Sequence, residues 1–237
     1  NTICHGFGLD KIPSRERIVC SWLPAYHDMG LVGVILSTLM HDGEAILMSP
    51  ASFLRRPGLW LESIQKANAS ITVAPCFGYQ WASSRIRQEE ADKLDLRCLR
   101  LAACGAEPIS PTVLSRFADH FKNAGFREAA FYPCYGLAES TLMVSGDHCG
   151  LISNSTVMPI NTFAKHFQRS ELQNNLAVET NAGTHSTELI HCGMPGVNTE
   201  VAIACTSTGK RLAKHQVGEI VVRSASNAIG YWNDADS

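Results

Sequence analysis

Short apolar runs alternate repeatedly with helix-like segments between residues 17 and 145, and this pattern constrains the fold most. The expected strands are 18–23, 45–48, 71–74, 99–103 and 129–132, and the expected helices are 28–39, 59–67, 79–90 and 111–121. Gly43 and Gly125 have the residue type that commonly ends a helix. Strands separated by helices at this spacing favour βαβ units. We therefore expect an α/β fold in which helices flank a mostly parallel sheet.

The pattern changes after residue 146, and this suggests a different organisation for the rest of the chain. Residues 147–190 are rich in Ser, Thr and Asn and show weak periodicity, with one possible helix at 163–172. Two apolar runs at 200–204 and 219–223 are expected to be strands around a turn at 207–210. We therefore divide the chain into an α/β subdomain at 1–146, a long loop or insertion at 147–190, and an incomplete antiparallel β subdomain at 191–237.

Composition excludes several classes of protein. The net charge is −2 and the Lys and Arg residues are scattered, whereas a nucleic-acid surface needs clustered positive charge. No apolar run approaches the roughly 20 residues of a membrane-spanning helix, so no membrane span is expected. The nine cysteines include no C-x-x-C pair, which disfavours a zinc site. Buried thiols in a reducing compartment are expected instead, and hence a cytoplasmic location.

Three loops that follow expected strands carry unusual side chains. They are PAYHD at 24–28, GAEP at 105–108 and YGLAE at 135–139. Ligands of open α/β sheets bind beyond the carboxyl ends of the strands, where loops lead into helices. The three loops are therefore expected to lie along one edge of the sheet and to form a binding site.

Four segments together resemble the fatty acyl-AMP ligases, a branch of the acyl-adenylate synthetase superfamily. They are SWLPAYHDMGLVG (21–33), SPASFLRRPGLWLESI (49–64), LAACGAEPIS (101–110) and FYPCYGLAESTLMVS (131–145). A fifth segment, GEIVVRSASNAIGYW (218–232), is shared more widely across the superfamily. The resemblance implies the large N-terminal domain of an adenylate-forming enzyme, in part, together with the start of a small antiparallel β subdomain.

The resemblance also implies a reaction. In this family a fatty acid carboxylate attacks the α-phosphate of ATP, with Mg²⁺, and forms acyl-adenylate and pyrophosphate. The acyl group then passes to an acyl carrier protein. Phosphoryl chemistry of this kind depends mainly on positioning and charge neutralisation. ATP and Mg²⁺ are therefore the expected cofactors, and a fatty acid and a carrier protein the expected partners.

The resemblance assigns the nucleotide site to two of the loops. Tyr135, followed by Gly136, matches the aromatic residue that stacks on adenine, and such stacking is worth about 1–3 kcal/mol. Gly105 and Ala106 match the loop whose backbone approaches the adenine. Each of these residues also has an ordinary structural explanation, as a core tyrosine or as part of a tight turn after a buried strand.

The resemblance assigns catalytic and acyl-binding roles as well. His27 matches the position beside the α-phosphate and the carboxylate, and Glu139 matches the carboxylate that holds Mg²⁺. Met29 and Gly30, with Phe77, are expected to line a tunnel for the acyl chain. Core packing is the alternative for these three, and a carboxylate near a helix N-terminus is the alternative for Glu139.

The chain also departs from the family pattern. Cys76 replaces the Asn that usually precedes the Phe read here as Phe77, and Cys104 replaces a residue that is commonly small or polar. Residues 147–190 fall where acyl-AMP ligases carry an insertion that acyl-CoA ligases lack. No phosphate loop, ribose-binding Asp or catalytic Lys of the C-terminal domain is recognised, so the chain alone is expected to be inactive. An acyl-CoA ligase and a ligase-like module that has lost catalysis remain the alternatives.

Overall fold

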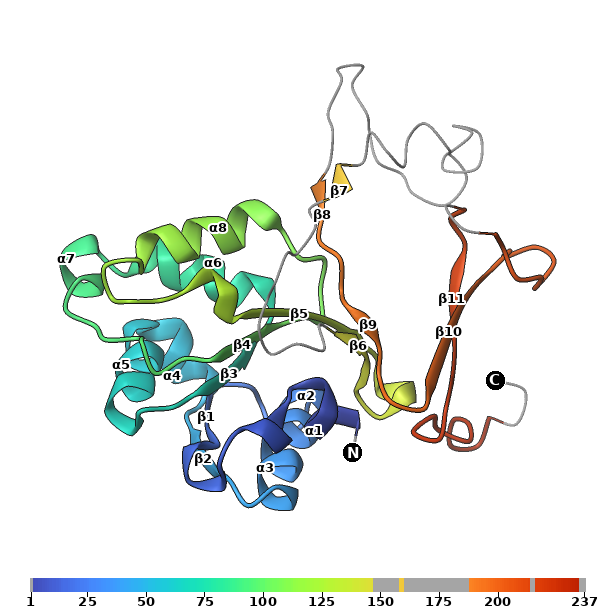
Figure 1. Ribbon diagram of the computed structural model, residues 1–237, viewed down its shortest axis with the longest axis horizontal. Helices are drawn as coiled ribbons and strands as arrows, with labels where there is room; N and C mark the ends of the chain where they lie inside the picture. Colours follow the sequence, from blue (N-terminus) through green and yellow to red (C-terminus); the bar gives the residue numbers. More distant parts are fainter. Residues whose placement is uncertain (1, 147–157, 160–187, 214–215, 235–237) are drawn as a thin grey trace.

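A seven-stranded sheet lies at the centre of the computed structural model, which describes residues 2–146, 158–159, 188–213 and 216–234 (Figure 1). The strand order is β2-β1-β3-β4-β5-β6-β9. The strands are β1 (Ile18–Ser21), β2 (Glu44–Leu47), β3 (Ile71–Ala74), β4 (Leu101–Cys104), β5 (Phe131–Gly136), β6 (Met143–Gly146) and β9 (Met194–Pro195). Strands β1 to β5 are parallel, and β6 and β9 extend the sheet in antiparallel fashion. The expected α/β fold with a mostly parallel sheet is confirmed.

The strand order reverses direction between β1 and β3. The chain goes from β1 outward to β2, then returns past β1 to β3 and continues to β4 and β5. In open parallel sheets such a reversal opens a crevice beyond the carboxyl ends of the two strands. The topology therefore predicts a ligand site next to the ends of β1 and β3.

Helices cover both faces of the sheet. They are α1 (Thr2–Gly6), α2 (Asp28–Gly30), α3 (Ser37–Met40), α4 (Pro50–Arg55), α5 (Gly58–Ala67), α6 (Cys76–Arg85), α7 (Gln88–Ala91) and α8 (Pro111–His120). Short single-turn segments are η1 (Leu9–Lys11), η2 (Ser14–Glu16), η4 (Glu128–Ala130) and η5 (Ala138–Ser140), and η3 (Leu31–Leu36) is π-helical. In Figure 1, α1, α2 and α3 group on one side of the sheet, and α4 to α8 on the other.

Two apolar clusters result, one on each face, because successive strand side chains point to opposite sides. In β3, Val73 belongs to the cluster under α1 and α2, whereas Ala74 belongs to the cluster under α4 to α8. The second cluster centres on Trp60, which is fully buried and donates its indole N–H to Thr72 Oγ1 at 3.0 Å. Strands buried on both faces explain the continuous apolar runs of the sequence.

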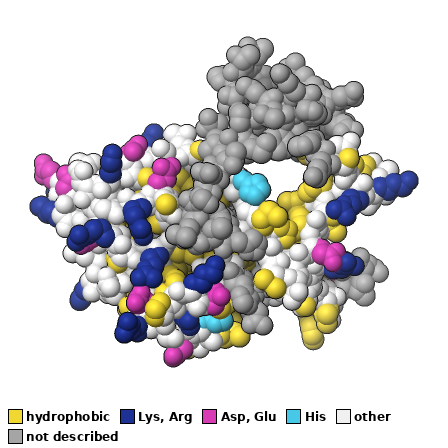
Figure 2. Space-filling view, viewed as in Figure 1, with side chains coloured by type: hydrophobic (Ala, Val, Ile, Leu, Met, Phe, Trp, Pro, Cys, Tyr) yellow, Lys and Arg dark blue, Asp and Glu magenta, His cyan; other side chains and the backbone are white. Residues whose placement is uncertain are grey.

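The chain after residue 190 adds an antiparallel ribbon. As expected, β10 (Thr199–Ala204) pairs with β11 (Glu219–Ser224). A second, short pair that was not expected, β7 (Met158–Pro159) with β8 (Glu188–Leu189), precedes it in the chain. The helix expected at 163–172 lies outside the described residues. Ile220 and Val221 are exposed on β11, and Figure 2 shows hydrophobic side chains on this ribbon, to the right. No helix within the described ranges has the length and apolarity needed to cross a membrane.

Several element boundaries differ from those expected. The helix expected at 79–90 is two helices, because Ile86 is extended and Glu90 accepts a hydrogen bond from the Arg87 amide to begin α7. The helix expected at 28–39 contains the π-helical segment η3 in its middle. The helix before β2 ends at Met40, and Asp42, not Gly43, has a positive φ. Strand β6 was not predicted from the sequence.

Candidate active site

A cavity of about 400 Å³ lies at the carboxyl ends of the strands, where the topology predicts a ligand site. Its walls come from the loops after β1, β4 and β5, together with the turn after α1. The lining residues are Phe7, Tyr26, His27, Asp28, Met29, Gly33, Val73, Gly105, Ala106, Cys134, Tyr135, Gly136, Ala138, Leu142 and Met143. The three loops singled out in the sequence therefore meet in one cavity.

The loop after β1 holds His27 by hydrogen bonds to its neighbour. Asp28 Oδ1 lies 2.6 Å from His27 Nδ1 and accepts a hydrogen bond from the Met29 amide at 2.6 Å. His27 Nδ1 also accepts a hydrogen bond from the Met29 amide at 3.2 Å. Both contacts are made through Nδ1, so they fix the orientation of the ring through this nitrogen.

The loop after β4 is fixed by its neighbours. Ala106 has φ +68°, a left-handed conformation that costs a non-glycine residue roughly 1–2 kcal/mol. Glu107 Oε1 accepts a hydrogen bond from the Phe77 amide at 2.6 Å and so caps the first turn of α6. Ser110 Oγ accepts from the Val113 amide and begins α8. The strained loop is thus tied to two helices.

The loop after β5 folds back sharply beneath Tyr135. The pairing of β5 with β6 shifts between Tyr135 and Gly136, and a tight turn follows in which the Leu142 amide bonds the Ser140 carbonyl. A Cβ at Gly136 would lie 1.8 Å from the Leu142 carbonyl oxygen. Only glycine fits at that position, and this close approach leaves the half-buried Tyr135 in the cavity wall.

The segment after β11 is bound to the same loop. Tyr231 Oη donates to Glu139 Oε1 at 2.5 Å, and the Ala228 amide donates to the Glu139 carbonyl at 2.7 Å. Thr141 Oγ1 donates to the Ser226 carbonyl at 2.7 Å. The hydrogen bond from Tyr231 lowers the pKa of the Glu139 carboxyl and raises that of the tyrosine. Glu139 is therefore held as a carboxylate.

The cavity gathers six of the nine predicted site residues: His27, Met29, Gly105, Ala106, Tyr135 and Gly136. Glu139 follows the lining residue Ala138, and its carboxylate bonds to Tyr231. Gly30 does not line the cavity, and a Cβ there would lie 2.2 Å from the Pro24 carbonyl oxygen. Phe77 also lies outside the lining, and its ring packs edge-on against Trp22 at 5.6 Å.

Sequence reasoning missed two parts of the wall. Phe7 comes from the turn after α1, and its ring packs edge-on against Tyr132 at 5.2 Å. The Tyr132 hydroxyl donates to the Gly6 carbonyl at 2.7 Å, across 126 residues. Leu142 and Met143 come from the start of β6, which no sequence signal marked. Together with Met29, these side chains give one side of the cavity an apolar lining.

A metal ion would find few protein ligands here. Within the described ranges, no three or more His, Cys, Asp or Glu side chains are grouped to bind one. Glu139 offers an exposed carboxylate with a lowered pKa, a hard oxygen ligand of the type that Mg²⁺ prefers. Mg²⁺ usually keeps several waters and takes other ligands from substrate phosphates, so a single carboxylate fits this ion.

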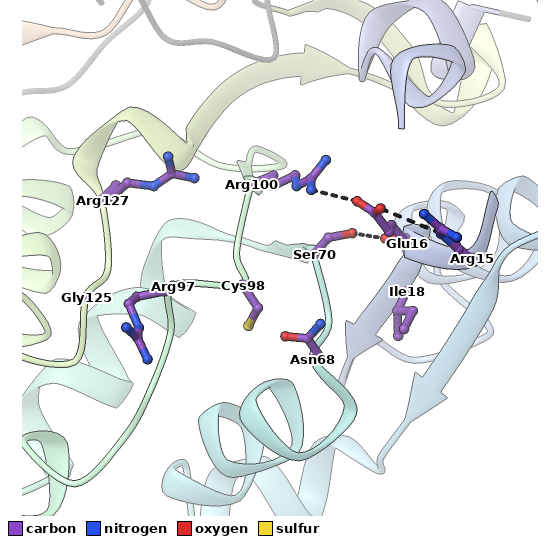
Figure 3. A pocket seen from close by; sticks show the side chains of 10 residues that line it. All are labelled: Arg15, Glu16, Ile18, Asn68, Ser70, Arg97, Cys98, Arg100, Gly125 and Arg127. Carbon is purple, nitrogen blue, oxygen red and sulfur yellow. Dashed lines mark hydrogen bonds and ion pairs between the residues drawn. The ribbon is translucent and has the colours of Figure 1, made fainter. Parts of the chain in front are cut away.

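A larger cleft, of about 680 Å³, opens at the opposite edge of the sheet, where the strands begin (Figure 3). Four arginines line it, and each has a polar partner. Arg100 pairs with Glu16 at 2.6 Å, and Arg15 lies 3.9 Å from the same carboxylate. Arg127 donates to the Leu99 carbonyl. No predicted site residue lies in this cleft, and ligands of parallel sheets bind at the other edge.

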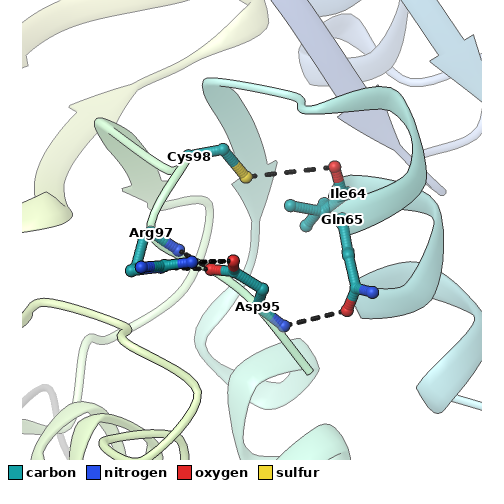
Figure 4. A network of polar contacts seen from close by, with 5 residues as sticks. All are labelled: Ile64, Gln65, Asp95, Arg97 and Cys98. Carbon is teal, nitrogen blue, oxygen red and sulfur yellow. Dashed lines mark hydrogen bonds and ion pairs between the residues drawn. The ribbon is translucent and has the colours of Figure 1, made fainter. Parts of the chain in front are cut away.

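The fourth arginine of that cleft belongs to a structural network (Figure 4). Arg97 pairs with Asp95 and lowers the pKa of that carboxyl to about 2. The Asp95 amide donates to Gln65 Oε1 at 2.8 Å, and the Cys98 thiol contacts the Ile64 carbonyl. These contacts fasten the end of α5 to the loop before β4, so we interpret this cleft as structural.

Comparison with known proteins finds relatives along nearly the whole chain. The profile of the AMP-binding enzyme family matches residues 2–232. The 4-hydroxyphenylalkanoate adenylyltransferase of Mycobacterium bovis is 34% identical over 225 residues, 95% of this chain and 34% of that protein. The medium-chain fatty-acid–acyl-carrier-protein ligase JamA of Moorena producens is 33% identical over 222 residues, 93% of this chain and 36% of that protein. The chain thus spans about a third of the length of the curated relatives it matches.

Solved structures show the same likeness. A fatty acyl-adenylate ligase from L. pneumophila, in complex with acyl adenylate and pyrophosphate, is 38% identical with a TM-score of 0.84. The match covers 99% of this chain and 39% of that one. The fold is therefore that of part of the N-terminal domain of adenylate-forming enzymes. Because the family profile and the structural match both extend over nearly all of its residues, the chain belongs to the AMP-binding enzyme family.

Proposed function

We propose that this chain is part of a fatty acyl-AMP ligase, which joins a fatty acid to the AMP moiety of ATP and releases pyrophosphate. The observation that carries the proposal is the convergence of three family-type loops on one cavity at the switch point of the sheet. The related L. pneumophila ligase, with acyl adenylate bound, has the same fold over 99% of this chain. The activity belongs to the whole protein, of which this chain supplies one part.

The polar side of the cavity supplies the nucleotide site in this proposal. Tyr135 stacks on the adenine, and the backbone at Gly105, Ala106 and Gly136 approaches it closely. Stacking of a base on an aromatic ring contributes about 1–3 kcal/mol. The strained Ala106 and the close-packed Gly136 hold this wall in place before the nucleotide arrives, which lowers the entropy cost of binding.

His27 acts where the two substrates meet. Asp28 and the Met29 amide both contact its Nδ1, so the ring orientation is fixed and Nε2 is the nitrogen that meets substrate in this proposal. From there the imidazole positions the carboxylate against the α-phosphate. Glu139 would hold Mg²⁺, which would supply neutralisation of the phosphate charge.

The apolar side of the cavity receives the start of the acyl chain. Phe7, Met29, Leu142 and Met143 provide this surface. Each buried methylene contributes up to about 0.8 kcal/mol, so a long tail favours binding. The product passes to an acyl carrier protein, as the name of the related ligase JamA indicates for that protein.

The test uses the full-length protein, incubated with ATP, Mg²⁺ and a series of fatty acids, with and without coenzyme A. Products are identified by mass spectrometry. Acyl-adenylate that accumulates and is not converted to acyl-CoA supports the proposal. Ready formation of acyl-CoA would identify an acyl-CoA ligase instead. If no acyl-adenylate forms with any of the acids, the protein is better explained as a ligase-like module without catalytic activity.

A further inference from the structure

The loop after β5 contains a turn with an unusual backbone conformation, centred on Thr141. This residue has φ +69° and ψ −52°, and the Leu142 amide donates to the Ser140 carbonyl across it at 2.8 Å. Together these features define a γ-turn of the rare, strained kind. Positive φ is especially unfavourable for a β-branched residue such as threonine. A strained turn of this type persists only where its surroundings hold it.

Contacts from outside the loop hold this turn. Thr141 Oγ1 donates to the Ser226 carbonyl at 2.7 Å, and Ser140 Oγ donates to Asn227 Oδ1 at 3.0 Å. The two acceptors lie 85 and 87 residues further along the chain, in the segment that follows β11. Ser140 is only 3% exposed, so its hydroxyl would lose a hydrogen bond that water could not replace.

The segment that holds the turn is itself fixed. Asn227 Nδ2 donates to the Val222 carbonyl at 2.9 Å, so the Asn227 side chain links β11 to the turn. The Ala228 amide continues the contact by donating to the Glu139 carbonyl at 2.7 Å. We call residues 226–228 the clamp segment, because each of them bonds to the loop after β5.

The turn determines where Leu142 lies. Leu142 follows Thr141 directly and forms part of the apolar side of the cavity. Its carbonyl accepts from the Leu137 amide at 2.9 Å, so the loop closes on itself. Its side chain packs against Gly33, where an added Cβ would lie 2.9 Å from Leu142 Cδ2. A change in the γ-turn would therefore move this part of the cavity wall.

We propose that Thr141 is a positioning residue for the acyl chain. The clamp segment holds the strained turn, and the turn places Leu142 in the apolar wall of the cavity. The Thr141 hydroxyl supplies a hydrogen bond that offsets the strain. Without it the turn relaxes to an ordinary conformation, and Leu142 leaves its place against Gly33. The consequence for acyl binding rests on the proposed ligase function, whereas the clamp follows from the contacts alone.

Three substitutions separate the hydroxyl from the strain. Thr141→Val keeps the branched side chain but has no hydroxyl, so the strain remains and its support is lost. Thr141→Ser keeps the hydroxyl and should behave as the unmodified protein does. Thr141→Gly also lacks the hydroxyl, but glycine adopts positive φ without steric cost, so the turn should remain. Thr112→Val is the matched control, because Thr112 is exposed in α8 and lines no part of the cavity.

Hydrogen exchange of the full-length protein, followed by mass spectrometry, measures the turn directly. In Thr141→Val, the protected amides of peptides that cover residues 137–143 should exchange roughly 5- to 150-fold faster, the factor that corresponds to the usual cost of such a backbone conformation. Thr141→Ser and Thr112→Val should exchange as the unmodified protein does, and Thr141→Gly nearly so. Unchanged exchange in Thr141→Val would show that the proposal is wrong. Exchange in Thr141→Gly as fast as in Thr141→Val would also overturn it, because strain would then not be what the hydroxyl offsets.

A second measurement tests the role in acyl binding. The probes are AMP and the dodecanoylsulfamate of adenosine, a stable mimic of acyl-adenylate, and calorimetry gives the dissociation constant of each. Thr141→Val should weaken binding of the dodecanoyl probe by a similar factor and binding of AMP much less, with recovery in Thr141→Ser. Equal losses for both probes, or no loss for the dodecanoyl probe, would overturn the positioning role.

The unmodified protein sets the reference for both probes. If it binds the dodecanoyl probe no more tightly than AMP, the cavity has no acyl wall for Thr141 to position, and the proposal is wrong. Neither hydrogen exchange nor calorimetry requires product to form. Failure of this proposal can therefore be distinguished from an absence of ligase activity, which the product analysis of the full-length protein reports.

Discussion

The hydroxyl of Tyr231 donates a hydrogen bond to the carboxylate of Glu139, although 92 residues separate them in sequence. Three more hydrogen bonds from the same two segments surround this contact, among them one from Ser140 Oγ to Asn227 Oδ1. The expected Mg²⁺ ligand is therefore positioned from outside its own loop. The segment after β11, for which no site residue was predicted from the sequence, lies against the loop that follows β5.

Replacing this tyrosine should change the acidity of its partner. In Tyr231→Phe the largest cause of the lowered Glu139 pKa is removed, so that pKa should rise towards the ordinary value for glutamate. The measurement is a carbon-detected NMR titration of the glutamate carboxyl groups. Tyr26→Phe is the matched control, because Tyr26 is 92% exposed and is not among the causes of the lowered Glu139 pKa. An unchanged Glu139 titration in Tyr231→Phe would contradict the assignment.

The same contact gives a pH dependence with a definite sign. The folded-state pKa of Glu139 lies below its unfolded value, so the contact stabilises the fold fully above the unfolded pKa. Its contribution is lost as the pH falls through the lower, folded pKa. Hydrogen exchange at the Ala228 amide, corrected for intrinsic rates, should show less protection in that acidic range, and Tyr231→Phe should show less dependence on pH.

Removing the aromatic ring from the cavity should weaken nucleotide binding. Tyr135→Ala in the full-length protein loses a stacking interaction worth about 1–3 kcal/mol. The dissociation constant for ATP should therefore rise roughly 5- to 150-fold. Tyr135→Phe keeps a ring and should bind nearly as the unmodified protein does. Isothermal titration calorimetry measures both, and equal affinities for the alanine variant and the unmodified protein would refute the stacking role.

Alanine substitutions at two glycines should lower stability for different reasons, steric overlap at Gly136 and backbone strain at Gly209. In Gly136→Ala the new Cβ would overlap the Leu142 carbonyl, so the loop must move, at a cost of about 3 kcal/mol or more. In Gly209→Ala nothing lies within 4 Å of the new atom, and only the left-handed φ of +64° costs stability, about 1 kcal/mol. Urea unfolding measures both changes. A cost for Gly136→Ala no larger than that for Gly209→Ala would contradict the close approach.

Replacing Trp60 with phenylalanine should lower the free energy of unfolding more than the same replacement at Trp232. Trp60→Phe leaves a void in a fully buried site and removes the hydrogen bond to Thr72, so the free energy of unfolding should fall by about 1–3 kcal/mol. Trp232→Phe is the control, because that side chain is 93% exposed and its loss should change stability by less than about 0.5 kcal/mol. Similar effects in both variants would show that the core is not centred on Trp60.

The sequence predicted the elements that depend on local pattern. Strand β3 coincides with the predicted run at 71–74, because four consecutive apolar or β-branched residues fit a strand buried on both faces. The two strands of the C-terminal ribbon were also predicted within one residue at each end. Convergence of the three loops followed from a rule of parallel sheets, and did not require knowledge of any side-chain contact.

What the sequence did not predict depends on contacts between distant residues. The end of α6 is set by a capping interaction at Arg87, which interrupts an otherwise helical pattern. Phe7, in the cavity wall, packs against Tyr132, which lies 125 residues away in the sequence. The Glu107 cap on the Phe77 amide spans 30 residues and has no periodicity. Patterns within a short window of sequence cannot predict such contacts, because the two residues lie far apart in the chain.

The hydrogen bond from Tyr132 to Gly6 has a consequence for biosynthesis. The two residues are 126 apart, so this contact cannot form until β5 has left the ribosome. At about 5–20 residues per second, that interval lasts roughly 6–25 seconds. Phe7 packs against Tyr132 in the finished fold, so this part of its apolar surface stays uncovered during the interval. Uncovered apolar surface on a nascent chain is a target for a chaperone.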